Sequence, residues 1–148
     1  MSQAVFVAPL TPARIKYGLL ILRVVVGIVF AVHGAEKVFE QTVPGVAQFF
    51  GQIGAPLPQI TAPFIAYLEF GGGILLILGL LTPLVAALLA FDMLGAIFLV
   101  HLPNGFSASN GGYEFVLTLF AASAALALTG PGAFALDDVF FKRNRSRN

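Results

Sequence analysis

A nearly uncharged stretch, Tyr67–Leu81, limits what this chain can fold into. The stretch is apolar enough for the hydrocarbon of a membrane, yet it contains one carboxylate, Glu69, followed by Gly71–Gly73. A carboxylate in hydrocarbon is costly and persists only where it faces protein, water or an opposite charge. Glycines let a neighbouring helix approach closely, and they also allow a local loosening in which carbonyls line a cavity. We therefore interpret this stretch as the inner wall of a small membrane bundle.

The composition supports a membrane protein. Of the 148 residues, 58% are hydrophobic and 10% are charged, whereas soluble domains average about 25% charged residues. So few charges cannot cover a water-facing surface of this size. The chain has no cysteine, which excludes disulfides, thiolate metal sites and cysteine-based redox chemistry within it. The predicted fold class is therefore all-α, an integral membrane four-helix bundle.

The apolar stretches predict a single membrane domain with four antiparallel spans. Each span is long enough to cross a hydrocarbon core of about 30 Å. The spans are predicted at about 16–35, 62–81, 83–102 and 113–130. The outer loop 36–61 is broken by prolines and glycines, and within it we predict an amphipathic helix at 46–53 that lies on the membrane surface. The apolar residues of this helix are Val46, Phe49, Phe50 and Ile53.

The positive charges predict the orientation. Arg14, Lys16 and a basic tail at 139–148 lie on the side of the termini, whereas the opposite loops contain a single basic residue, Lys37. Because cytoplasmic loops carry the excess of Lys and Arg, both termini are predicted to be cytoplasmic. The basic tail is interpreted as a topology determinant and a contact for anionic lipid, and no nucleic-acid partner is expected.

Three charged residues are predicted to form a buried layer. Arg23, Glu69 and Asp92 each lie eight to ten residues from the end of a span, or about 12–15 Å deep at 1.5 Å per residue. One cation then faces two carboxylates, and the surplus carboxylate is expected to bind a proton. The alternative is purely structural, with an Arg23–Glu69 ion pair that holds helices together and a protonated Asp92 that donates a hydrogen bond. Whether Arg23 pairs with Glu69 or with Asp92 stays open.

A second group of polar residues is predicted at the outer edge of the bundle. His33, Lys37, His101 and Glu114 lie at span ends, with Tyr67 just below them. A metal site is disfavoured because no histidine pair has i,i+4 spacing, and haem ligation by the two histidines is disfavoured further. One remaining interpretation is a set of head-group-level residues that pair among themselves. The other is the mouth of a cavity for a small polar or quinone-like head group.

These residues form motifs that resemble those of DoxX-type membrane proteins, over about residues 15–138. The first-span motif is Arg23-x3-Gly27-x2-Phe30-x2-His33-Gly34-x2-Lys37. The second is Glu69-x-Gly71-Gly72-Gly73-x-Leu75-Leu76-x-Leu78-Gly79-Leu80-x-Thr82. Span four opens with Gly112-Tyr113-Glu114 and ends with Gly130-Pro131-Gly132-x3-Leu136-Asp137.

The resemblance implies a four-helix protein of the bacterial inner membrane. The family takes its name from a small subunit of a thiosulfate:quinone oxidoreductase, and other relatives are linked to membrane-associated oxidoreductase complexes in oxidative-stress defence. The leading hypothesis is a membrane subunit that docks a redox or respiratory partner, or a second copy of the chain, and helps to form a quinone or small-molecule pocket. The alternatives are a quinone-coupled oxidoreductase subunit with its own turnover, and a structural or assembly subunit without a ligand. A persulfide route cannot run on this chain alone, because it has no cysteine.

Overall fold

The computed structural model describes residues 9–145. Most of these residues lie in helices, which short loops connect. The long helices are α1 (Pro12–Ala35), α3 (Pro58–Leu78), α4 (Thr82–Ala96) and α5 (Glu114–Thr129), and the shorter ones are α2 (Val43–Gln52) and α6 (Leu136–Arg145). The π-helical turns η1 (Glu36–Glu40) and η2 (Ile97–His101) extend α1 and α4, and short 3₁₀ turns occupy Leu102–Asn104 and Ala108–Asn110. Residues 146–148 of the predicted basic tail lie outside the described residues.

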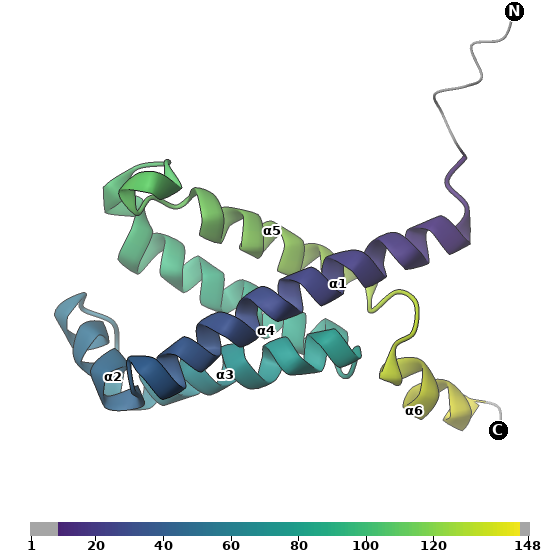
Figure 1. Ribbon diagram of the computed structural model, residues 1–148, viewed down its shortest axis with the longest axis horizontal. Coiled ribbons are helices and arrows are strands. Elements are labelled where there is room, and N and C mark those ends of the chain that lie inside the picture. The colour runs from purple at the N-terminus through teal and green to yellow at the C-terminus, as the bar shows by residue number, and fades with distance from the viewer. Residues whose placement is uncertain (1–8, 146–148) are drawn as a thin grey trace, which may run out of the picture.

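The four long helices form two antiparallel pairs. Helix α1 packs along α3, and α4 packs along α5; Figure 1 shows the two pairs crossing. The described ends of the chain lie at one end of the bundle, while α2 and the turns after α4 lie at the other (Figure 1). The fold is the predicted all-α membrane bundle, and the cytoplasmic placement of the termini stays a prediction of the charge pattern.

Within residues 9–145, three of the helices are long and apolar enough to cross a membrane. They are Pro12–Glu40, Pro58–Leu78 and Thr82–Asn104, the first and last counted with their π- and 3₁₀-helical extensions. Helix α5 is apolar but has 16 residues, or about 24 Å at 1.5 Å per residue. This length is somewhat less than a typical hydrocarbon core of about 30 Å.

Local sequence signals explain where the helices begin and end. Thr11 caps α1 by accepting a hydrogen bond from the backbone N–H of Arg14, and Pro12 occupies the first helical position, where its missing N–H has no cost. Helix α3 ends at Gly79, which adopts a left-handed conformation with φ of +70°. This is the usual way for glycine to stop a helix and reverse the chain.

Glycines bring α1 and α3 into backbone contact. A methyl group on Gly34 would lie 2.7 Å from the carbonyl carbon of Glu69, and one on Gly27 would lie 2.7 Å from the carbonyl oxygen of Gly73. Small residues at such positions allow close helix packing in membranes. The close-packing role that we assigned to the glycines of α3 therefore holds for Gly73, whereas a methyl group on Gly71 would meet no atom within 4 Å.

Helix α2 begins earlier than predicted and does not simply rest on the membrane surface. Val46 and Ala47 are buried against Ala62 of α3, and Phe50 packs beside them. The expectation of a surface helix was wrong in this respect, because its apolar face finds a protein partner. Helix α2 therefore covers one end of the bundle.

Asp137, at the start of α6, holds the turn between α3 and α4. Its carboxylate accepts hydrogen bonds from the backbone N–H groups of Leu81 (2.6 Å) and Thr82 (3.0 Å), and its own N–H donates to the carbonyl of Gly79 at 2.9 Å. A carboxylate at a helix N-terminus satisfies free N–H groups and complements the helix dipole. Asp137 thus acts as an N-terminal cap of α4 supplied by a residue 55 positions away.

We expect Asp137→Ala to lower the free energy of unfolding by about 1–2 kcal/mol, because loss of a capping side chain costs this much in proteins. Thermal unfolding in detergent measures the change. Asp137→Asn is the matched control, since it keeps one acceptor oxygen and should lose less stability. Equal melting temperatures for the wild type and Asp137→Ala would contradict the capping role.

Candidate functional site

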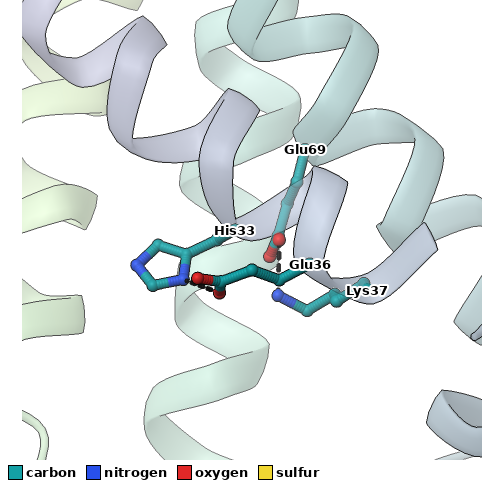
Figure 2. A network of polar contacts seen from close by, with 4 residues as sticks. All are labelled: His33, Glu36, Lys37 and Glu69. Atoms are coloured by element: carbon teal, nitrogen blue, oxygen red, sulfur yellow. Dashed lines mark hydrogen bonds and ion pairs between the residues drawn. The ribbon is translucent and has the colours of Figure 1, made fainter. Parts of the chain in front are cut away.

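Lys37 and Glu69 form an ion pair inside the bundle. Lys37 lies on η1 and Glu69 on α3, and Lys37 Nζ donates a hydrogen bond to Glu69 Oε2 at 2.5 Å. Figure 2 shows the two side chains pointing toward each other from their separate helices. The Glu69 side chain is 5% exposed and that of Lys37 21%. The carboxylate within the glycine-rich stretch is therefore neutralised by a cation, as its position in an apolar helix requires.

Asp92 of α4 adds a second carboxyl group to this pair. Its carboxyl group lies close enough to Glu69 and Lys37 to interact with the charges of both. A carboxylate has no donor, so a hydrogen bond between the two acids requires that one of them carry a proton. Among the described residues, nothing donates a hydrogen bond to the buried Oδ2 atom of Asp92. The group therefore holds one cation, two acids and one unused acceptor.

These three residues lie in the wall of a cavity of about 610 Å³. Helices α1, α3, α4 and α5 supply most of the wall, and α2 covers one end. The wall is mainly apolar and rich in phenylalanine; its charged and polar side chains are His33, Lys37, Thr61, Glu69, Asp92 and His101. Cavities of about 300–1,000 Å³ with a few convergent polar groups are typical small-molecule sites.

The π-helical turns place two of these side chains. Lys37 lies on η1, and His101 is the last residue of η2. Such turns inside helices occur frequently at functional sites. We had predicted that span one ends near Ala35; instead the helix continues through η1, which carries Lys37.

The residues predicted for the outer mouth separate into two groups. His33 lines the cavity and contacts Glu36 Oε2 through Nδ1 at 2.9 Å (Figure 2). His101 also lines the cavity, and its Nδ1 atom lies 2.7 Å from the carbonyl oxygen of Gly111. Tyr67 and Glu114 do not line it.

Tyr67 and Glu114 were therefore wrongly assigned to the cavity mouth. Tyr67 is 57% exposed on the outer surface of α3, because it is two residues before Glu69 and so lies on a different side of the helix. Glu114 turns back to the loop before α5, where its Oε2 accepts a hydrogen bond from the N–H of Ala108 at 2.9 Å.

Arg23 is buried but contacts neither Glu69 nor Asp92. Its Nη1 donates to the carbonyl oxygen of Pro131 at 2.8 Å, and its Nη2 lies 3.5 Å from that of Phe134. Asp137 and Asp138 are the carboxylates near its charge. The predicted pairing of Arg23 with Glu69 or Asp92 is therefore wrong, and Lys37 is the cation that meets Glu69.

The register of α1 and α3 explains this correction. Gly34 packs against the backbone of Glu69, and Arg23 lies beside Gly79 at the far end of α3. In an antiparallel pair, each step toward the end of one helix is a step toward the start of the other. A depth counted from the span ends does not contain this stagger. One turn beyond Gly34, the long side chain of Lys37 reaches back to Glu69.

Taken together, the fold and the site define a small multi-pass membrane protein with an apolar cavity whose wall contains a lysine–carboxylate cluster. The DoxX family model matches residues 18–102, and the chain belongs to the DoxX family. This match runs from within α1 to the end of η2 and so includes Lys37, Glu69 and Asp92.

Several bacterial proteins resemble the chain over most of its length. It is 44% identical over 133 residues to "Putative oxidoreductase CatD" of Bacillus subtilis, covering 90% of this chain and 94% of the relative. It is 31% identical to two inner membrane proteins of Escherichia coli: YphA (80% of this chain, 87% of the relative) and YqjF (85% and 94%). No solved structure matches the chain. The chain is thus a multi-pass protein of the bacterial inner membrane.

Proposed function

We propose that this protein is an inner-membrane subunit that binds an amphipathic, quinone-like molecule in its cavity and works with a redox partner. The observation that carries the proposal is the juxtaposition, in one apolar cavity, of the Lys37–Glu69 pair and an Asp92 oxygen without a donor. The name of the Bacillus subtilis relative favours redox chemistry over a purely structural role.

The chemistry of the site suits a quinone head group. A ring with two carbonyl oxygens needs an apolar, aromatic surface and hydrogen-bond donors at its edge. Phenylalanine side chains supply the surface. Lys37 lines the cavity and its ammonium supplies a donor, while the carboxylate of Glu69 neutralises its charge.

The acid pair suits a ligand that exchanges protons. Reduction of a quinone to a quinol consumes two electrons and two protons. Glu69 and Asp92 hold a proton between them when they are hydrogen-bonded, and Asp92 Oδ2 can accept a further hydrogen bond, for instance from a quinol hydroxyl. The chain has no cysteine, so thiol groups of this chain do not supply the electrons. We assign that step to the partner.

Glu69→Gln tests the proposal. The substitution keeps the size of the side chain but removes the charge that orients Lys37, so bound ligand should be lost. The protein is purified in mild detergent and extracted with organic solvent, and the extract is analysed for quinone. We expect quinone with the wild type and at least a tenfold smaller amount with Glu69→Gln.

Tyr67→Phe is the matched control, because Tyr67 lies on the same helix but is exposed outside the cavity. It should retain the wild-type amount of quinone. Equal amounts of extracted quinone in the wild type and both variants would contradict the proposal. A wild-type protein that stably co-purifies with a larger complex, and yields no small molecule, would indicate a structural subunit instead.

A further inference from the structure

The wall of the cavity is open between α3 and α4. Phe64 of α3 lines the cavity and is 55% exposed on the surface of the bundle. Phe91 of α4 lines it and is 73% exposed, and Leu88, one turn earlier, is 38% exposed. A side chain that belongs both to the cavity wall and to the outer surface lies at an opening. Because α3 and α4 are membrane-spanning helices, this opening faces hydrocarbon.

The opposite wall is closed by buried side chains. Phe30 of α1 is 1% exposed, and Val116 and Leu119 of α5 are 6% and 7% exposed. Nearer the end of the bundle, the ring of His33 contacts Phe115 of α5 edge-on, with 5.9 Å between ring centres. Phe115 also lines the cavity and is 45% exposed, as are Phe49 (43%) and Leu99 (42%), so the cavity opens at this end of the bundle as well. Away from this end, the exposed lining side chains, Phe64, Leu88 and Phe91, lie on α3 and α4.

We infer that the ligand enters sideways from the bilayer between α3 and α4, and that it is a lipid-soluble molecule with a polar head and a long hydrocarbon tail. The inference rests on the proposed function and adds the class of ligand and its route. Asp92 follows Phe91 directly in the sequence, so a head group bound at Asp92 lies near the opening that Phe91 lines. A cavity of about 610 Å³ has the size of sites for drug-sized ligands, so a longer tail continues past Phe91 into lipid.

Gly95 offers a direct test of the route. It lies on α4 one turn after Phe91 and lines the cavity, and a methyl group added to it would meet no atom within 4 Å. Gly95→Leu therefore introduces bulk on the open side of the cavity without striking the backbone. Gly18→Leu is the control, because Gly18 also has open space around it but does not line the cavity.

Two probes separate the head from the tail: a benzoquinone without a tail, and the same ring with a decyl chain. Binding of both is measured in detergent, alongside thermal unfolding of each variant. We expect Gly95→Leu to weaken binding of the decyl probe at least tenfold and to bind the tail-less probe within threefold of the wild type. Gly18→Leu should bind both as the wild type does. As a second variant, Phe91→Ala should speed association of the decyl probe several-fold.

The outcomes distinguish the two proposals. If Gly95→Leu binds both probes as the wild type does, or loses both equally, the lateral route is overturned while the proposed ligand class stands. If the wild type binds neither probe, the proposed function fails and the inference fails with it. If Gly95→Leu unfolds, unchanged association of the decyl probe with Phe91→Ala overturns the route.

Discussion

Arg23→Ala is expected to reduce the free energy of unfolding by about 3 kcal/mol, because two carbonyl oxygens lose their donor at about 1–3 kcal/mol each. Arg23 is 1% exposed and hydrogen-bonds to the carbonyl oxygens of Pro131 and Phe134. Its loss leaves these carbonyls without their donor and leaves Asp137 without its nearby positive charge. Because Asp137 caps α4, the loss of Arg23 also destabilises the turn between α3 and α4. Accumulation in membranes and thermal unfolding in detergent measure the effect.

Arg14→Ala is the control for this prediction, because Arg14 is exposed in the first turn of α1. It should accumulate and unfold as the wild type does. If Arg23→Ala matched the wild type in both measurements, the link from Arg23 to the 131–137 segment would not stabilise the fold.

The second large effect is expected for Gly34→Ala. The added methyl group would strike the backbone of α3, with the carbonyl carbon of Glu69 at 2.7 Å and Phe70 closer still. Backbone atoms cannot move aside as a flexible side chain does, so α1 and α3 must separate. We expect a loss of about 1–3 kcal/mol, the usual cost of overpacking, together with loss of bound ligand, because Lys37 is then displaced from Glu69.

Gly71→Ala is the matched control, since a methyl group there meets no atom within 4 Å. It should unfold at the wild-type temperature or slightly above, because alanine favours a helix over glycine by up to about 1 kcal/mol. Equal stability and equal ligand content for Gly34→Ala and Gly71→Ala would show that the α1–α3 contact is looser than the structure indicates.

The sequence was sufficient for the fold class because hydrophobic length and scarcity of charge leave few alternatives. It also indicated that Glu69 needs a partner, since an isolated carboxylate does not persist in hydrocarbon. It did not identify that partner. Arg23 and Lys37 share one face of the first span, and the choice between them depends on the stagger of α1 against α3. That stagger is set by where Gly34 meets Glu69, a tertiary contact that the spacing within one helix does not contain.

Two other features depended equally on tertiary contacts. Helix α2 was visible as an amphipathic pattern, but its role as a cover over the bundle depends on the burial of Val46 and Ala47 against Ala62. The capping role of Asp137 joins residues 55 positions apart, and no local pattern predicts such a pair. Asp137 is nevertheless the last residue of the C-terminal motif, Gly130 to Asp137, that resembles the family.

Light-induced labelling with an azido derivative of the quinone tests the central claim most directly, because it reports where the ligand sits in the intact membrane protein. Membranes containing the wild-type chain are irradiated with the probe, and the labelled peptides are mapped by mass spectrometry. We predict labelling of the α3 and α4 segments around Glu69 and Asp92, and its suppression by excess unlabelled quinone. Labelling spread over the exposed phenylalanines of every helix, or unaffected by the competitor, would contradict a specific ligand site in this cavity.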